Sequence, residues 1–339
     1  MRPVIRRPMG NLAPVFTANL PFRLIVRPPA GVLKRLDFYV RGQHTTDITT
    51  GATHGEVNYF QAFKLTAKRK NGLPDIVWEA LPRDLKKITA MLDGQLMPRA
   101  NPATAGTSAA TAHFGVFSVF FAPPRKKCRF PDDWGLHSDD LIDNDPIVIE
   151  GRYGAVTDIG TGATAIAQTT SVTAEVEQTQ PGDPKPGLVL GCQATFFPHE
   201  SDIKSALHTL PLGNVELYCG AMFRSHDNSA AAAQEVDTFP TIIELSHSQR
   251  GVVAGDLFIE EKKKTGVWSG LATADVFAGT IMPMASPEFI ESQMIRRTEG
   301  AFTFFIDSLL TASDETGAVT PTTSDGVHAA VIGAYKTGA

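Results

Sequence analysis

The chain has 339 residues, of which 42% are hydrophobic and 20% charged, a balance that is typical of a soluble globular protein and excludes a disordered chain. Its formal net charge of −5 disfavours a protein that holds nucleic acid by charge, so we expect no specific nucleic-acid partner. The 29 glycines and 23 prolines leave little room for long helices.

The N-terminal segment is basic and rich in proline. Arg2, Arg6 and Arg7 are followed by no apolar run of the kind that a secretory signal needs. We therefore expect residues 1–14 to form an extended basic arm, and we expect the protein to be made in the cytoplasm.

Short segments in which apolar and polar residues alternate dominate the rest of the chain, as in strands with one buried face. Phe16–Val26 and Val32–Arg41 both show this pattern and are separated by Pro28-Pro29-Ala30-Gly31, so they predict an antiparallel hairpin. Further strands are predicted at Gly115–Phe121, Pro146–Tyr153, Ser171–Gln178, Leu188–Phe197, Asn214–Phe223, Thr241–Ser246, Phe302–Asp307 and Val327–Tyr335.

Four short stretches have helical spacing instead. We expect brief helices, inserted in loops, at Gly55–Leu65, Arg83–Leu92, Asp202–Leu210 and Pro287–Gln293.

A run of prolines and glycines interrupts the strands near the middle of the chain. Residues 181–187, Pro-Gly-Asp-Pro-Lys-Pro-Gly, can continue neither a strand nor a helix and predict a linker. The sequence thus predicts an all-β protein with two jelly-roll sandwiches in tandem, residues 15–180 and 188–339. No sequence repeat between the two halves is evident from these segments.

The usual motifs of enzymes are missing from the sequence. It contains no GxGxxG, GxxxxGK[ST], GxSxG or HExxH pattern, so we assign no catalytic residue and no cofactor-binding residue, and we expect a protein that is not an enzyme. The three cysteines, Cys128, Cys192 and Cys219, lack CxxC spacing and are expected to be buried thiols.

One acidic segment could bind a cation. Asp139, Asp143 and Asp145 have the spacing of hard-cation ligands, so a structural calcium is one interpretation and a solvated acidic loop is the other. Glu260-Glu261 is a candidate carboxylate pair for glycoside hydrolysis, but the lysines that follow favour an exposed charged turn.

The order of these features gives the chain a likeness to a known family. The first two strands are followed by the apolar segment Gly115–Pro124, by Phe130–Leu136 with its Trp and acidic neighbours, and by the strands Pro146–Tyr153 and Ser171–Gln178. The second half repeats the plan. In this order the chain resembles the double jelly-roll major capsid proteins of tailless icosahedral, membrane-containing bacteriophages, of the tectivirus, corticovirus and adenovirus type.

The resemblance implies a coat protein of a virion, synthesised in the host cytoplasm. It implies a homotrimer that places six jelly rolls around a threefold axis, a pseudo-hexameric block that tiles an icosahedral shell. The partners that it implies are neighbouring capsomers, penton and minor capsid proteins, and an internal membrane, with a basic arm under the shell as the alternative to membrane contact.

Two other classes of protein share this size and composition. One is a secreted two-jelly-roll hydrolase of glycans or glycoproteins, and the other is a phage receptor-binding component. The hydrolase predicts a leader peptide and disulfides, for which the sequence offers no signal. The capsid interpretation predicts a trimer in solution.

Overall fold

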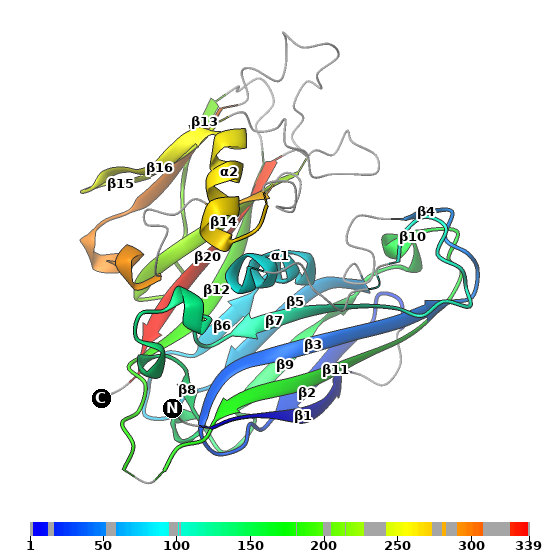
Figure 1. Cartoon of the computed structure of the whole chain (residues 1–339), viewed down its shortest axis with the longest axis horizontal. Coiled ribbons are helices and arrows are strands. Elements are labelled where there is room, and N and C mark those ends of the chain that lie inside the picture. Colours follow the sequence, from blue (N-terminus) through cyan, green and yellow to red (C-terminus); the bar gives the residue numbers. More distant parts are fainter. Residues whose placement is uncertain are drawn as a thin grey trace.

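The computed structural model of the chain describes residues 3–12, 17–51, 59–94, 101, 103–180, 182–198, 205–213, 215–226, 242–272, 280–282, 290–307 and 326–337. Strands dominate it, and they form two sandwiches joined along one side (Figure 1). The predicted all-β class is therefore confirmed.

The first sandwich packs one sheet, in the order β1-β11-β3-β7, against a second, in the order β6-β5-β9-β2. Alternation along the strands turns aromatic rings into the space between the sheets. The ring of Phe38 lies 4.8 Å from that of Phe117 in its own sheet and 5.2 Å from that of Phe63 in the facing sheet. The strands are β1 (Val4–Leu12), β2 (Pro21–Val26), β3 (Val32–His44), β5 (Phe60–Ala67), β6 (Ile76–Glu79), β7 (His113–Phe120), β9 (Ile147–Tyr153) and β11 (Ile166–Glu177).

The second sandwich repeats this plan. Its sheets run β12-β20-β14-β17 and β13-β19-β15-β16, and Phe304 of one sheet packs against Phe197 and Phe223 of the other. In both sandwiches the first and last strands are neighbours, and most successive strands cross between the sheets, the exceptions being the pairs β5-β6 and β15-β16, as in the jelly-roll topology. The strands are β12 (Leu188–Pro198), β13 (Ser205–Thr209), β14 (Leu217–His226), β15 (Ile242–His247), β16 (Gly251–Leu257), β17 (Thr280–Ile281), β19 (Phe302–Asp307) and β20 (Gly326–Lys336).

One sheet continues from the first sandwich into the second. β12 pairs in parallel with β6 through Cys192 opposite Trp78 and Gln193 opposite Glu79, which makes a nine-stranded sheet. The buried apolar residues of both sandwiches form a single cluster. The two units are therefore joined by sheet and core as well as by the chain.

Two helices occupy the same position in their sandwiches. α1 (Pro82–Asp93) lies between β6 and β7, and α2 (Phe258–Ser269) lies between β16 and β17. α1 begins with Pro82, which lacks the N–H that a first turn leaves unpaired, and it ends at Gly94 in the left-handed conformation. Within the described residues, no helix is long and apolar enough to cross a membrane.

The remaining elements are short. β8 (Leu136–His137) pairs with β3, β18 (Ile295–Arg296) pairs with β14, and β4 (Thr50–Gly51) pairs with β10 (Gly160–Thr161). The 3₁₀ helices are Arg125–Lys127, Pro131–Asp133, Ser138–Asp140, Val156–Ile159, Ile290–Gln293 and Arg297–Glu299.

The predicted hairpin between the first two alternating segments is wrong. β2 pairs with β9 in one sheet, whereas β3 pairs with β11 and β7 in the facing sheet. Alternation shows that each strand has one buried face, but it does not show whether the two faces lie in one sheet or oppose each other across the core.

The helix predictions have mixed outcomes. Arg83–Leu92 is confirmed as the body of α1. Gly55–Leu65 is wrong where it is described, because a bulge between Phe60 and Ala62 gives strand β5 an irregular apolar spacing. Asp202–Leu210 is wrong over β13, and Pro287–Gln293 contains a 3₁₀ helix at Ile290–Gln293. Residues 52–58, 199–204 and 283–289 lie outside the described part of the chain.

The predicted arm and linker have clear positions. Val4–Leu12, within the segment 1–14, is strand β1 and pairs with β11. Residues 182–187 lie between β11 and β12, the last strand of the first sandwich and the first strand of the second. The boundaries of the two units stay a prediction.

Candidate functional site: the junction of the two sandwiches

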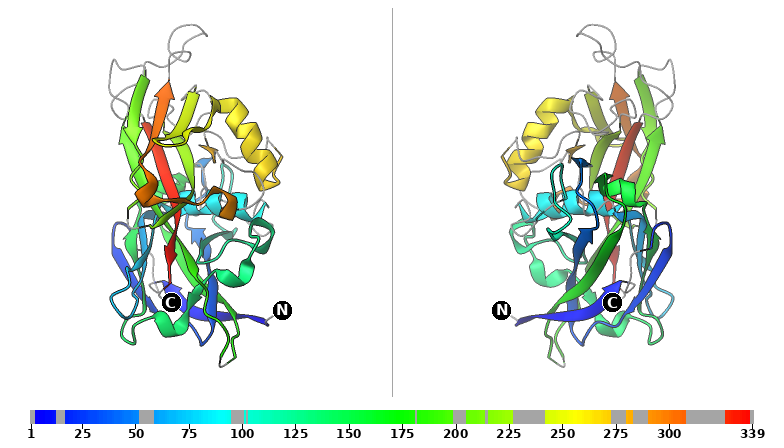
Figure 2. Two further views of the ribbon diagram at one scale, coloured as in Figure 1. Left: turned by 90° about the vertical axis from the view of Figure 1, so that its left-hand side faces the viewer. Right: turned by 90° about the vertical axis from the view of Figure 1, so that its right-hand side faces the viewer.

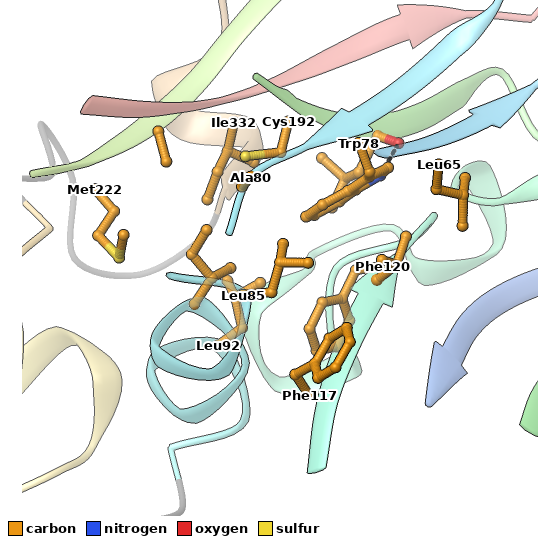
Figure 3. Close-up of a cluster of buried hydrophobic side chains, with 14 of the residues drawn as sticks. Leu65, Trp78, Ala80, Leu85, Leu92, Phe117, Phe120, Cys192, Met222 and Ile332 are labelled. Atoms are coloured by element: carbon orange, nitrogen blue, oxygen red, sulfur yellow. Dashed lines mark hydrogen bonds between the residues drawn. The ribbon is translucent and has the colours of Figure 1, made fainter. Parts of the chain in front are cut away.

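Helix α1 fills the angle between the two sandwiches. Figure 3 shows Leu85 and Leu92 of α1 in one cluster of buried side chains with Met222 and Ile332, which belong to β14 and β20 of the second sandwich. All four side chains are buried. The outer face of the second sandwich's first sheet is thereby covered by a helix of the first sandwich.

A buried ion pair links the same helix to the same sheet. Arg224 of β14 donates through Nε to Asp84 of α1 at 2.5 Å, and the two side chains are 0% and 1% exposed. Next to it Lys87 donates to Thr280 of β17 at 3.0 Å. Burial alone would raise the pKa of the Asp84 carboxyl, but the charge and hydrogen bonds of Arg224 lower it below its usual value. The pair therefore stays ionised inside the junction.

A second contact joins the loops of the two sandwiches. Oε1 of Glu291, between β17 and β18, accepts hydrogen bonds from the Cys128 thiol, from the backbone of Arg129 and Phe130, and from the indole of Trp134, at 2.9–3.2 Å. Burial opposes ionisation of this carboxyl, but hydrogen bonds from the Cys128 thiol and from backbone N–H groups, among them those of Phe130 and Arg129, lower its pKa below the ordinary value. The carboxylate thus holds a loop of the first sandwich to the second.

The end of α2 closes the junction on its other side. Lys127 donates to the carbonyl of Trp268, and its ammonium lies 4.4 Å from the centre of that indole ring. At the strand pairing, the indole of Trp78 donates to the carbonyl of Leu190 at 3.0 Å, and the backbone of Leu190 donates to Phe121 at 3.0 Å. Together these contacts fix the angle between the sandwiches.

The three acidic candidates do not converge on one point. Asp139 lies 3.7 Å from an imidazole nitrogen of His137, Asp143 lies 2.9 Å from the ammonium of Lys70, and Asp145 accepts from Arg23 at 3.2 Å. Among the described residues no three His, Cys, Asp or Glu side chains are grouped as metal ligands. A calcium ion in this loop stays a prediction of the sequence.

The pair Glu260-Glu261 is not the exposed charged turn that the sequence favours. Both residues lie in the first turn of α2, and Glu261 is 2% exposed. Glu260 contacts Lys263 at 2.6 Å and Glu261 contacts Lys264 at 2.8 Å, one turn along the helix. Each carboxylate is therefore paired within the helix.

The larger of two described surface hollows has a volume of about 600 Å³ and lies on the sheet β6-β5-β9-β2. Glu79 and Glu150 line it together with Arg23, Lys64 and Arg152, and Lys64 lies 3.3 Å from Glu79. It is an open, mixed-charge surface.

The three cysteines are buried thiols, as expected, and burial raises the pKa of each.

Sequence reasoning missed the residues of this junction. Asp84, Lys87 and Arg224 are ordinary charged residues in a sequence, and only their burial distinguishes them. One signal was available, because Lys-Lys-Xaa-Thr followed five residues later by Gly occurs at Lys86 and again at Lys262. These two segments are α1 and α2.

No protein-family model matches the sequence, and no curated protein matches it. Solved structures match over nearly the whole chain. The crystal structure of the STIV MCP has a TM-score of 0.68 at 10% identity and covers 98% of this chain and 96% of that one. VP54 of PBCV-1, fitted into a reconstruction of the virophage Sputnik, has a TM-score of 0.65 at 9% identity, with 98% and 94% covered.

This chain has the double jelly-roll fold. The Faustovirus major capsid protein also matches, with a TM-score of 0.55 at 8% identity over 100% of this chain and 91% of that one. At such identities the likeness is one of fold. It confirms the predicted architecture of two jelly rolls in tandem, with short helices between strands.

Proposed function

We propose that this chain is the major capsid protein of an icosahedral virus. The observation that supports it best is the double jelly roll itself, which spans 98% of the chain in a match to the STIV MCP. Two sandwiches held at a fixed angle give one subunit two similar lateral units. In this proposal the protein works by assembly and resides in the virion.

The proposed unit of assembly is a homotrimer with six jelly rolls around its threefold axis. Such a block is close to hexagonal and can tile a flat facet. Neighbouring trimers are its main partners, and penton proteins, minor capsid proteins and an inner membrane are further partners in the proposal. The junction supports it, because a rigid angle between the sandwiches is what a closed ring requires.

Sedimentation of the purified protein tests this proposal. We expect a species of three times the subunit mass of 36.5 kDa, and negative-stain images of that species should show near-hexagonal particles. A stable monomer at micromolar concentration contradicts the proposal. A glycan-release assay on the same sample addresses the hydrolase, which no contact among the described residues favours over assembly.

A further inference from the structure

The two helices dock on their own sandwiches by the same contact. Thr89 of α1 donates to the carbonyl of Leu85 at 2.6 Å and accepts from the backbone N–H of Ser118, at β7, at 2.9 Å. In α2, Thr265 makes the corresponding pair of bonds, donating to the helix carbonyl one turn earlier at 2.8 Å and accepting from Met282, just after β17, at 2.9 Å. α1 and α2 are therefore equivalent parts of the two jelly rolls.

The equivalence extends along both helices. Counted from the two threonines, Asp84 corresponds to Glu260, and Lys87 corresponds to Lys263. Both helices end at a glycine with positive φ, 61° at Gly94 and 79° at Gly270. The chemical character is kept at these positions, an acid in the first turn and a lysine one turn later.

The same face is buried on one helix and open on the other. On α1, Asp84, Lys87 and Met91 are 1% exposed or less, and Asp84 and Lys87 are bonded to the second sandwich. On α2 the corresponding side chains are open, Glu260 at 41%, Lys263 at 54% and Val267 at 82%. Figure 2 shows α2 on the flank of the second sandwich, next to α1. Val267, 82% exposed on α2, thus occupies the position at which α1 carries the buried Met91.

We propose that the open face of α2 docks on the first sandwich of a second copy of this chain, as α1 docks on the second sandwich of its own copy. The inference rests on the capsid function proposed above and names the surface through which the trimer forms. Each copy then offers α2 on one side and receives its neighbour's α2 on the other, a heterologous contact that closes into a ring.

The receiving surface follows from the strand registers. Ile281, beside Met282, is opposite Phe223, and Thr280 is opposite Arg224. The matching positions of the first sandwich, counted from Ser118, are Phe117 opposite Phe38 and Val116 opposite Tyr39. Tyr39 on β3 thus corresponds in position to Arg224, which binds Asp84 in the internal junction. Val116 corresponds in position to Thr280, which accepts a hydrogen bond from Lys87.

This part of the sheet suits the open face of α2. Tyr39 and Val116 are partly exposed, and Arg41, two residues along the same face of β3, is exposed. An aromatic ring and a valine complement Val267, and a guanidinium complements Glu260. The acid–arginine pair of the internal junction thereby has a counterpart between copies.

The edge strands follow the same correspondence between the two sandwiches. Within the chain β6 pairs in parallel with β12, whereas β16 and β1, the corresponding strands, are edges of their sheets in the described part of the chain. Each edge carries an exposed valine, Val252 at 61% and Val4 at 46%. Docking of α2 brings β16 of one copy beside β1 of the next, where both edges are covered.

Two substitutions of exposed apolar residues test the surface. Val267→Asp should raise the dissociation constant of the trimer about tenfold or more, while Leu207→Asp, at a residue 68% exposed on β13, should leave it within about twofold. Analytical ultracentrifugation measures both, and thermal unfolding checks that both variants fold. A Val267→Asp protein that trimerises as well as Leu207→Asp overturns the inference and leaves the capsid proposal standing. A monomeric wild type overturns the capsid proposal itself.

A charge exchange tests the receiving surface. Glu260→Arg and Arg41→Glu should each weaken the trimer about tenfold, and the double variant should recover most of the loss, because the opposite charges again face each other between copies. If the double variant is as weak as the sum of the two, the receiving surface on β3 is wrong.

Discussion

The ion pair between Asp84 and Arg224 is the residue-scale feature on which the junction depends. Both side chains are out of contact with water, so water cannot solvate either charge when its partner is removed. Asp84→Ala leaves the Arg224 guanidinium buried without its partner and should lower the free energy of unfolding by about 3–5 kcal/mol. Urea denaturation followed by circular dichroism measures this loss.

An exposed ion pair provides the matched control. Arg250 and Glu299 lie 2.8 Å apart with side chains 51% and 36% exposed, so Arg250→Ala should lower the free energy of unfolding by less than about 1 kcal/mol. Replacing both junction charges with Asp84→Leu and Arg224→Met should restore much of the stability. Equal losses for the buried and the exposed pair would contradict the role given to Asp84.

At the scale of elements, the paired ends of β3 and β7 carry a buried histidine pair. His44 and His113 stack with ring centres 5.4 Å apart, and the phenol of Tyr59 hydrogen-bonds to His113. Burial, and then electrostatic repulsion from the neighbouring His44, lower the pKa of His113 to about 4. In the folded chain His113 therefore stays unprotonated at pH values at which the same histidine of the unfolded chain, with a pKa near 6.5, binds a proton.

Acid should loosen this end of the first sandwich. Between about pH 6.5 and 4 the unfolded chain binds more protons, so stability is complete above this range and falls by roughly 3 kcal/mol as pH falls through it. Unfolding free energies measured from pH 7.5 to 4.5 should show a shallower slope for His113→Gln than for the wild type. Identical slopes would exclude His113 as the source of the acid sensitivity.

At the scale of the whole molecule, one sheet and one apolar cluster run through both sandwiches. Separating them would expose Met222 and Ile332 and leave Arg224 without Asp84. We therefore expect both sandwiches to unfold in one cooperative transition. Variants that keep a single tryptophan, Trp78 in the first sandwich or Trp268 in the second, should report the same denaturation midpoint, and two separate midpoints would refute this coupling.

Much of the architecture was predictable from local patterns. The alternation at residues 146–153, 171–178 and 327–335 corresponds to β9, β11 and β20, because a strand with one buried face needs apolar residues at every second position. Arg83–Leu92 was predictable as a helix for a similar reason. α2 was not, because it contains the charged run Glu-Glu-Lys-Lys-Lys, and burial of Glu261 and Lys262 contradicts the usual preference of charges for water.

The sequence by itself determined the strands whose apolar residues alternate regularly, such as β9, β11 and β20, since the period of a buried face is a local property of the chain. Only the tertiary structure decided which strands pair, because register and sheet membership depend on contacts between residues far apart in sequence, such as Trp78 with Cys192. It also decided the roles of Asp84, Arg224 and Glu260. The sequence does not show which residues surround a given carboxylate. Whether the carboxylate joins two sandwiches or stays open to a neighbouring molecule depends on what the fold packs against it.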